Sequence, residues 1–258
     1  MTEGKNSFSG KSALADIDVL ILAGGMGTRL RSVVPDLQKV LVEVGDTPFL
    51  EFIINQVCEF GAKRIILAVG HKSEQVRDWL SKRNDTRDLE ILLSVEEEPL
   101  GTGGALRNSV DMLRSNLVMV LNGDSYADVD IGALVSMQDT CGADVALIAV
   151  EVPDISRYGS LVIEESGAVI SFAEKCNKTD PPVFGLVNSG IYLMRRAVIE
   201  KIQPDTRISL EEDVLPKYCL RGLFALPQKV PFLDIGTPET WRESEQFFNE
   251  LETKEPAS

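Results

Sequence analysis

Apolar residues recur with two different periods along this chain, and its first half is organised around short continuous apolar runs. Four such runs are DVLILAG (residues 18–24), RIILAVG (64–70), NLVMVLNGD (116–124) and ADVALIAVEV (143–152). Runs of this length, rich in β-branched residues and several of them ending at glycine, are typical of strands buried on both faces. Amphipathic stretches with helical spacing separate them. Strands that alternate with helices predict right-handed crossovers and a largely parallel sheet covered on both faces.

The clearest helical stretch lies between the first two runs. DTPFLEFIINQVCEFG (residues 46–61) carries its apolar residues at helical spacing, so one face would pack on the sheet. Pro48 suits the first turn, and either Asp46 or Thr47 would cap it. Gly61 suits the end of the helix.

The second half is richer in strands. GSLVIEE (159–165), AVISFAEK (168–175) and LVNSGIYLMRR (186–196) follow one another, and helical patterns return only at residues 209–222 and 237–251. We find no internal repeat, linker or low-complexity tract. We therefore expect a single domain over residues 17–250 whose first half binds a nucleotide and whose second half shapes the substrate site. Residues 1–16 would be a flexible leader and residues 251–258 a tail.

Composition narrows the possible partners. The chain has 26 basic and 40 acidic side chains, a net charge of −14, which repels nucleic-acid backbones. A polyanionic substrate would therefore need local cations or a divalent metal. Four scattered cysteines and one histidine support neither a zinc site nor a disulfide framework. Because no apolar run approaches the roughly 20 residues of a membrane span and the N-terminus lacks a signal-peptide pattern, we expect a cytoplasmic protein without membrane association.

A glycine-rich turn follows the first predicted strand. Gly24, Gly25 and Gly27 stand where ligands bind in open α/β sheets, and glycines let backbone N–H groups approach phosphate oxygens. Two common phosphate motifs do not fit. A P-loop requires Gly-Lys-Ser/Thr after four intervening residues, and a dinucleotide fingerprint requires glycine or alanine where this chain has Leu30.

Two cations follow the turn. Arg29 offers a planar fork of donors that suits a triphosphate, and Lys39 offers a mobile point charge. Taken alone, this stretch fits equally well a simple turn followed by solvated surface cations.

Seven motifs in order resolve the ambiguity, because together they resemble the sugar-phosphate nucleotidyltransferase family from about residue 17 to 248. LAGGMGTRL resembles its nucleotide loop, EPLGTGGAL its base-contacting segment, and LNGD its first metal aspartate. RYG, FAEK and VNSGIY resemble its sugar-binding positions, and FLDIGTPETW its second metal aspartate. One position departs from the family: the lysine usually lies in a Pro-Lys-Pro context but here in Gln38-Lys39-Val40.

The resemblance implies a three-layer α/β/α, Rossmann-like nucleotidyltransferase fold with a mixed, mostly parallel central sheet. It implies that a sugar 1-phosphate attacks the α-phosphorus of a nucleoside triphosphate and releases pyrophosphate, with Arg29 and Lys39 as catalytic cations and Mg²⁺ as the cofactor. Nucleotide contacts would come from Leu22, Ala23, Gly24, Gly25, Gly27, Thr28, Arg29, Lys39, Glu96, Gly101 and Gly103. Sugar-phosphate contacts would come from Gly159, Glu174, Lys175 and Asn188, and metal ligands would be Asp124 and Asp234.

Within the family, the chain resembles the D-glycero-D-manno-heptose 1-phosphate guanylyltransferases. GTRLRSVVPD, PFLEF, RYGSL and ISFAEK carry this likeness, together with the short length. The product would then be a GDP-heptose for bacterial surface polysaccharides or glycoproteins. Mannose 1-phosphate and the other nucleotides (dTTP, CTP, UTP) stay open, as do a homodimer and a regulatory homologue that binds nucleotide sugars without turnover.

Guanine specificity has a physical rationale in the acidic run before PLGTGG. Guanine presents two adjacent donors, N1–H and the 2-amino group, which one carboxylate can accept together. Glu96 stands at the spacing at which relatives read the base. The alternative is that all three glutamates of this run are solvated loop charges.

Overall fold

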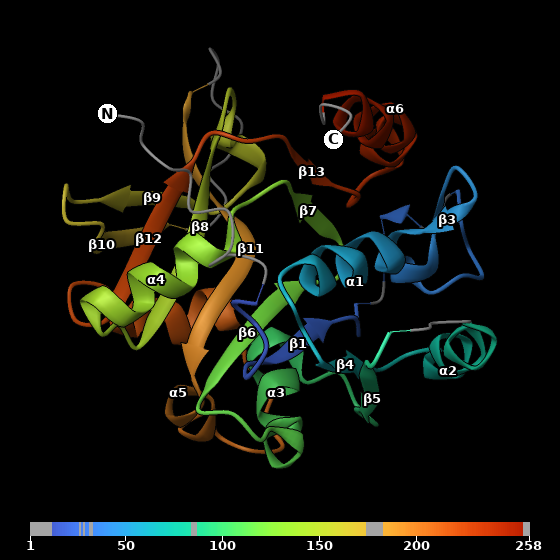
Figure 1. The fold of residues 1–258 in the computed structure, drawn as a ribbon, viewed down its shortest axis with the longest axis horizontal. Helices are drawn as coiled ribbons and strands as arrows, with labels where there is room; N and C mark the ends of the chain where they lie inside the picture. Colours follow the sequence, from blue (N-terminus) through green and yellow to red (C-terminus); the bar gives the residue numbers. More distant parts are fainter. Residues whose placement is uncertain are drawn as a thin grey trace, which may run out of the picture.

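The structure is a computed structural model, and it describes residues 12–25, 27, 29–30, 33–83, 87–173 and 183–254. A large sheet with helices on both faces makes up most of the fold (Figure 1). Its strands are β1 (Asp18–Leu22), β4 (Arg64–Val69), β5 (Glu90–Val95), β6 (Leu117–Asn122), β8 (Val145–Val152), β9 (Ser160–Ile163), β10 (Val169–Ala173), β11 (Gly185–Arg195) and β12 (Leu223–Gln228). Two small sheets consist of β2 (Glu43–Val44) with β3 (Thr47–Pro48), and β7 (Ser125–Ala127) with β13 (Phe232–Asp234).

The helices connect these strands. They are α1 (Phe49–Glu59), α2 (Ser73–Lys82), α3 (Gly101–Asn108), α4 (Ile131–Cys141), α5 (Arg196–Glu200) and α6 (Pro238–Lys254). Shorter turns are the 3₁₀ helices η2 (Lys39–Leu41), η3 (Val110–Met112), η4 (Ile155–Arg157) and η6 (Leu215–Tyr218), and the π-helical turn η5 (Leu210–Val214).

The large sheet has a parallel half and a mixed half. Its order is β10-β9-β11-β6-β1-β4-β5, with β8 paired to β11 and β12. The pairs β6-β1, β1-β4 and β4-β5 are parallel, whereas β11 runs antiparallel to β6, β8 and β9. The expected α/β fold with a mixed central sheet is confirmed.

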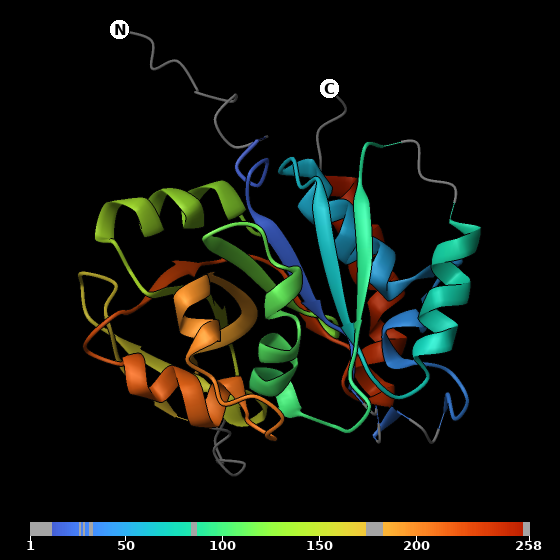
Figure 2. The same cartoon turned by 90° about the horizontal axis from the view of Figure 1, so that it is seen from below.

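Alternation along β1 shows how the layers form. Val19 and Ile21 belong to one apolar cluster, which includes residues of α1, α4 and α6, while Leu20 belongs to the cluster of α3 and α5. Successive strand residues point to opposite faces, so a strand that is apolar throughout must be covered twice. Figure 2 shows this for β4 and β5, which have α1 and α2 on one side and α3 on the other.

The first helix begins later than its sequence pattern predicts. Thr47 and Pro48 form strand β3 instead of a capped first turn, and α1 starts at Phe49 without a side-chain cap. The prediction of Asp46 or Thr47 as the cap was therefore wrong: the short β2–β3 hairpin takes up the backbone just before the helix.

Both ends of the expected domain pack on the fold. The expected leader falls partly outside the described residues, but Leu14 is fully buried and its amide donates to the carbonyl of Phe60 at 2.9 Å. The expected tail begins inside α6, where Leu251 packs against the core. Among the described residues, no helix is long and apolar enough to cross a membrane.

Candidate active site

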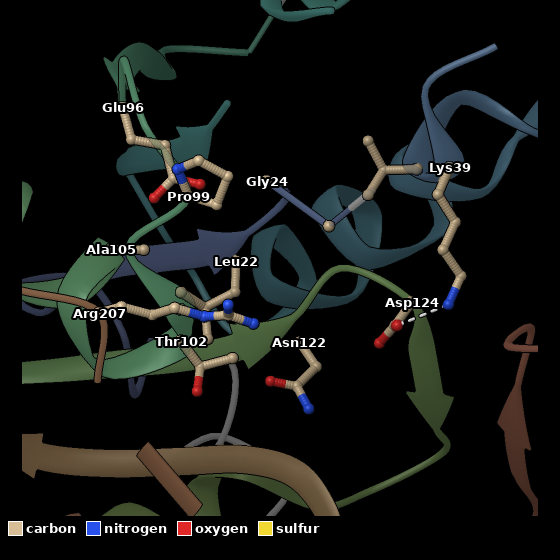
Figure 3. Close-up of a pocket in the computed structure, with 13 residues that line it drawn as sticks. Leu22, Gly24, Lys39, Glu96, Pro99, Thr102, Ala105, Asn122, Asp124 and Arg207 are labelled. Carbon is tan, nitrogen blue, oxygen red and sulfur yellow. Dashed lines mark hydrogen bonds and ion pairs between the residues drawn. The ribbon is translucent and has the colours of Figure 1, made fainter. Parts of the chain in front are cut away.

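A cavity of about 290 Å³ opens where β1, β5 and β6 end. Figure 3 shows Glu96 and Pro99 at one end of it, and Lys39 with Asp124 at the other. Its lining comes from both the glycine turn and the later motifs, namely Leu22, Gly24, Gly25, Lys39, Val40, Glu96, Pro99, Gly101, Thr102, Ala105, Asn122, Asp124 and Arg207. One end therefore offers a carboxylate, and the other offers an ammonium group beside a carboxylate.

The glycine turn forms one wall and packs against the lysine. Leu22, Gly24 and Gly25 line the cavity, whereas Ala23 is buried and its amide donates to Ala68 of β4 at 2.8 Å. Gly27 has a φ of 55°, and a Cβ built there would lie 3.2 Å from the Cβ of Lys39. The turn and the lysine stem thus contact each other directly.

Lys39 and Asp124 form the charged end of the cavity. The Nζ of Lys39 lies 2.6 Å from Oδ2 of Asp124, with the lysine side chain 9% exposed and the aspartate 43% exposed. Desolvation by the surrounding protein raises the pKa of Asp124, although its side chain keeps contact with solvent. Lys39, with a smaller effect of Arg29, lowers that pKa more, and the result is below the ordinary value. Asp124 is therefore ionised at neutral pH.

Glu96 forms the other end. Its carboxylate accepts a hydrogen bond from the amide of Leu100 at 3.3 Å and lies over two glycines. A Cβ built on Gly24 or Gly70 would come within 2.9 or 2.8 Å of its Oε1. Burial raises the pKa of Glu96, and the Leu100 amide opposes that rise in part. The two glutamates that follow are exposed, so Glu96 alone of the three is built into the cavity wall.

The glycines of α3 serve packing as well as the cavity. Gly101 lines the cavity with a φ of 72°, and a Cβ there would lie 2.6 Å from the carbonyl oxygen of Ile208. The amides of Gly103 and Gly104 both donate to that carbonyl, at 2.9 and 3.2 Å. Gly103 is therefore not part of the lining; it lets α3 approach the segment that carries Ile208.

A second cavity of about 240 Å³ adjoins the first and shares Asn122 and Asp124 with it. Its lining is more polar and comes largely from the second half of the chain, namely Arg29, Asn122, Asp124, Ser125, Tyr158, Gly159, Phe172, Asn188, Ser189, Ser209, Glu211, Glu212, Phe232 and Asp234. Two predicted sugar-site residues meet here, since the amide of Asn188 donates to the carbonyl of Gly159 at 3.0 Å.

The small β7–β13 sheet brings the two predicted metal aspartates together. Asp234 lies opposite Ser125 in this antiparallel ladder, and the amide of Ile235 donates to the carbonyl of Asp124 at 3.0 Å. Burial and the negative charge of Asp124 raise the pKa of Asp234 above its ordinary value. The ionised Asp124 thus disfavours ionisation of Asp234, and both carboxylates face one cavity.

This pair fits a divalent cation. Within the described part of the chain, no group of three or more His, Cys, Asp or Glu side chains is arranged as a metal site. Mg²⁺ commonly takes one or two carboxylates and completes its shell with water and substrate phosphates. Asp124 and Asp234 match that donor set, and a cation between them would relieve their repulsion.

Comparison with known proteins assigns the chain to a family. The profile of the family described as Nucleotidyl transferase matches residues 18–250. The chain belongs to the nucleotidyl transferase family. The resemblance inferred from the seven motifs is thereby confirmed.

The relatives of this transferase include enzymes for two sugars. It is 34% identical over 225 residues to the D-glycero-alpha-D-manno-heptose 1-phosphate guanylyltransferase of Campylobacter jejuni, covering 87% of this chain and 97% of the relative. It is 30% identical over 230 residues to the mannose-1-phosphate guanylyltransferase of Mycobacterium tuberculosis, covering 88% of this chain and 63% of that relative. The crystal structure of HddC from Yersinia pseudotuberculosis complexed with GMP-PN matches with a TM-score of 0.78 and 36% identity, over 90% of this chain and 99% of HddC.

The transferase also has a hydrogen-bonded hub that its sequence motifs did not reveal. The carboxylate of Glu211 accepts from the hydroxyls of Thr102 at 2.6 Å, Ser209 at 3.2 Å and Tyr192 at 3.3 Å. Tyr192 in turn accepts from the side-chain amide of Asn188 at 2.6 Å. Burial and the charge of Glu211 raise the pKa of Tyr192 well above its ordinary value, so it stays a neutral donor.

Arg207 is a further cation at the first cavity that was not predicted. Its side chain is exposed and extends toward Leu22 and Thr102 (Figure 3). Neither Arg207 nor Glu211 has a local signal: Glu211 lies in the stretch 209–222, whose pattern predicts a helix, and Arg207 precedes that stretch outside every motif. The contact between Glu211 and Thr102 joins positions 109 residues apart. Of the predicted site residues, Thr28, Glu174 and Lys175 lie outside the described residues.

Proposed function

We propose that this transferase moves GMP from GTP to D-glycero-alpha-D-manno-heptose 1-phosphate, giving GDP-heptose and pyrophosphate. The observation that carries this proposal is the junction of the two cavities at Asp124, with Lys39 2.6 Å from its carboxylate. One cavity suits a nucleotide and the other a sugar phosphate, and their phosphates would meet at the charged junction. The names of relatives, one of which was solved with GMP-PN, support guanine.

The nucleotide would lie along the first cavity. Guanine would stack near Pro99 and donate N1–H and its 2-amino group to Glu96, while the phosphates extend toward Lys39 at the other end. Amides of the glycine turn would approach the phosphates without side-chain obstruction. Arg207 adds a cation on the same path.

The sugar phosphate would occupy the second cavity. Gly159 and Asn188 would contact the sugar, as would Glu174, and Lys175 would bind its phosphate. The register of the β11–β8 ladder shifts between Asn188 and Tyr192, which supports this role for Asn188, because a break in the regular pairing redirects side chains locally.

The chemistry is a displacement at phosphorus that needs positioning and charge neutralisation more than a protein nucleophile. A phosphate oxygen of the sugar 1-phosphate forms a bond to the α-phosphorus of GTP, and the bond from that phosphorus to the β-bridging oxygen breaks with its electron pair on pyrophosphate. Lys39 would neutralise the phosphates at the reacting centre, and Arg29 would stabilise charge on the departing pyrophosphate. Asp124 and Asp234 would hold Mg²⁺, which when bound supplies positive charge to the phosphate oxygens.

A second candidate is mannose 1-phosphate as the acceptor. The mycobacterial mannose-1-phosphate guanylyltransferase favours it, although the chain spans only 63% of that relative. A regulatory homologue that binds nucleotide sugars without turnover is a third candidate, which the presence of Arg29, Lys39, Asp124 and Asp234 disfavours. We also propose that the enzyme is cytoplasmic and that it forms a homodimer. Sedimentation analysis would test the homodimer.

Pyrophosphate release tests the proposal. The purified chain with Mg²⁺ is assayed with each of five nucleoside triphosphates against heptose, mannose and glucose 1-phosphates. Release that is fastest with GTP and the heptose phosphate is the expected result. A preference for GTP with mannose 1-phosphate would mean that mannose 1-phosphate, and not the heptose phosphate, is the acceptor. GDP-sugar binding without release from any pair would favour the regulatory homologue.

A further inference from the structure

Gln38, the residue before Lys39, is an almost fully buried amide at the centre of a hydrogen-bonded brace. Its side chain is 3% exposed. Its Nε2 donates to the carbonyl of Ala23, and its Oε1 accepts from the amide of Val40 at 3.2 Å. Its own backbone amide donates to Oε1 of Gln75 at 2.8 Å. Both the side-chain oxygen and the side-chain nitrogen of Gln38 are therefore bonded to backbone groups around the site.

The brace connects three elements that converge on the nucleotide cavity. Ala23 follows β1 and begins the glycine turn, Val40 lies in the η2 turn that contains Lys39, and Gln75 lies on α2. Gln75 also donates from Nε2 to the carbonyl of Asp36 at 2.8 Å, so α2 holds the chain on both sides of residue 37.

Lys39 follows this brace directly in the chain. Its stem packs on Gly27 and its Nζ lies 2.6 Å from Asp124, yet the η2 turn that carries it has only three residues. A flexible lysine side chain contributes most to catalysis when its backbone is fixed, because misplacement by about 1 Å can lower a rate as much as 10²-fold.

We propose that Gln38 is a positioning residue that directs Lys39 at the reacting phosphates, with Gln75 as its outer support. The proposal rests on the proposed function for the role of Lys39. Gln38 takes the place of a rigid flank: proline would fix φ and remove an amide, whereas Gln38 holds the same backbone through its side chain and keeps its amide for Gln75. Loss of the side-chain amide should leave the lysine charge in place but reduce its alignment.

The principal test compares Gln38→Leu with a matched control. Gln138 on α4 is also buried, 2% exposed, and its Nε2 donates to the carbonyl of Ala143 at 2.6 Å, but it lies outside both cavities. Gln38→Leu should lower kcat about tenfold to a hundredfold with KM for the sugar phosphate nearly unchanged. Gln138→Leu should lower the melting temperature by a similar amount and leave kcat unchanged. Gln75→Leu, which keeps Gln38, should lower kcat by about a third as much and serves if Gln38→Leu does not fold.

A double-mutant cycle separates positioning from a general structural effect. In a Lys39→Met background, Gln38→Leu should lower the residual kcat less than twofold, because it acts through the lysine. An equal loss in both backgrounds would overturn the proposal.

A readout without turnover keeps this inference distinct from the proposed function. The acetylation rate of the Lys39 amine, measured by peptide mass spectrometry relative to Lys63, should rise severalfold in Gln38→Leu and stay constant in Gln138→Leu. If the wild-type chain transfers no nucleotide to any sugar phosphate, the proposed function fails and the acetylation rate alone decides the role of Gln38. An unchanged acetylation rate in Gln38→Leu would overturn that role whether or not the wild-type chain is active.

Discussion

The two cavities that meet at Asp124 are built and charged in different ways. The first lies where parallel strands β1 and β6 end, and its wall includes the apolar Leu22, Val40 and Ala105. The second takes part of its lining from β7, β11 and β13; β7 pairs antiparallel with β13, and β11 pairs antiparallel with β8. Among its described lining residues, one cation, Arg29, faces four carboxylates: Asp124, Asp234, Glu211 and Glu212.

If the first cavity holds the nucleotide and the second the sugar phosphate, as proposed, this difference means that the two substrates are recognised by different means. A planar base can be selected in the first cavity by shape and by hydrogen bonds to Glu96. A sugar-phosphate dianion entering the second cavity meets like charges, which repel it strongly where water is partly excluded. On the proposed function, the second cavity would need added positive charge, for which a divalent cation and Lys175 are the proposed sources, whereas the first would need it mainly at the junction.

The largest effect should come from removing the ammonium group at the junction. Lys39→Met should lower kcat by about 10²–10³, because it removes a charge aimed at the reacting phosphates. Steady-state pyrophosphate release measures this. The control is Lys63→Met, which changes an exposed lysine just before β4 that lines neither cavity. A loss in Lys63→Met of the same size would show that the effect is not specific to the junction.

Changes to the Asp124–Asp234 pair or to its metal should affect the second cavity and not base binding in the first. Asp234→Asn should raise the Mg²⁺ concentration for half-maximal rate by about tenfold or more, since Mg²⁺ relies on few protein carboxylates. Chelation of Mg²⁺ should abolish binding of the sugar phosphate but leave guanosine binding intact by calorimetry. Asp111→Asn, on the exposed side of η3, is the control. Metal-independent binding of the sugar phosphate would contradict the charge comparison.

The choice of nucleotide should depend on Glu96, which lies at the end of the first cavity opposite Lys39 and Asp124. Glu96→Gln should reduce the preference in kcat/KM for GTP over UTP by about tenfold, since an amide cannot accept both guanine donors. The exposed Glu97 offers a matched control, because Glu97→Gln removes the same charge but should leave the preference for GTP unchanged. An unchanged preference in Glu96→Gln would remove Glu96 from base recognition.

The pKa of Glu96 gives this preference a pH dependence. Burial raises that pKa above the ordinary 4.5, so the carboxylate that accepts from guanine is present above the raised pKa and lost as pH falls through it. KM for GTP should therefore rise as the pH falls from neutral through the raised pKa of Glu96, and it should rise more than KM for UTP. Glu96→Gln should lack this difference, and a wild-type profile without it would contradict the assignment.

The smallest effect should come from the hub between the cavities. Tyr192→Phe removes the hydroxyl that joins Asn188 to Glu211 and should raise KM for the sugar phosphate roughly two- to tenfold, the usual value of one buried hydrogen bond. Tyr218→Phe on η6 is the control. If KM for GTP rises instead, the hub belongs to the nucleotide cavity.

Local motifs allowed much of the lining of the first cavity to be predicted from the sequence, because these residues lie at or directly after strand ends. Leu22, Gly24 and Gly25 come from one turn, and the strand before it was recognisable from its apolar run. Lys39 is positioned by the hydrogen bonds of Gln38, which no local sequence pattern predicts.

The second side depends on contacts that are distant in sequence. Asp124 and Asp234 meet through the β7–β13 ladder, whose strands have three residues each and no distinct periodicity. Glu211 reaches Thr102 only because the segment at Ile208 packs on the glycines of α3. The resemblance to a family supplied the aspartates, but residues outside its motifs, such as Arg207, were missed.

A crystal structure with GDP-heptose and Mg²⁺ would test the central claim most directly. The two-cavity arrangement predicts guanine against Glu96 and Pro99, the sugar beside Gly159 and Asn188, and the diphosphate passing Asp124. A nucleotide sugar bound elsewhere, or with its base in the cavity lined by Asn188, would contradict it.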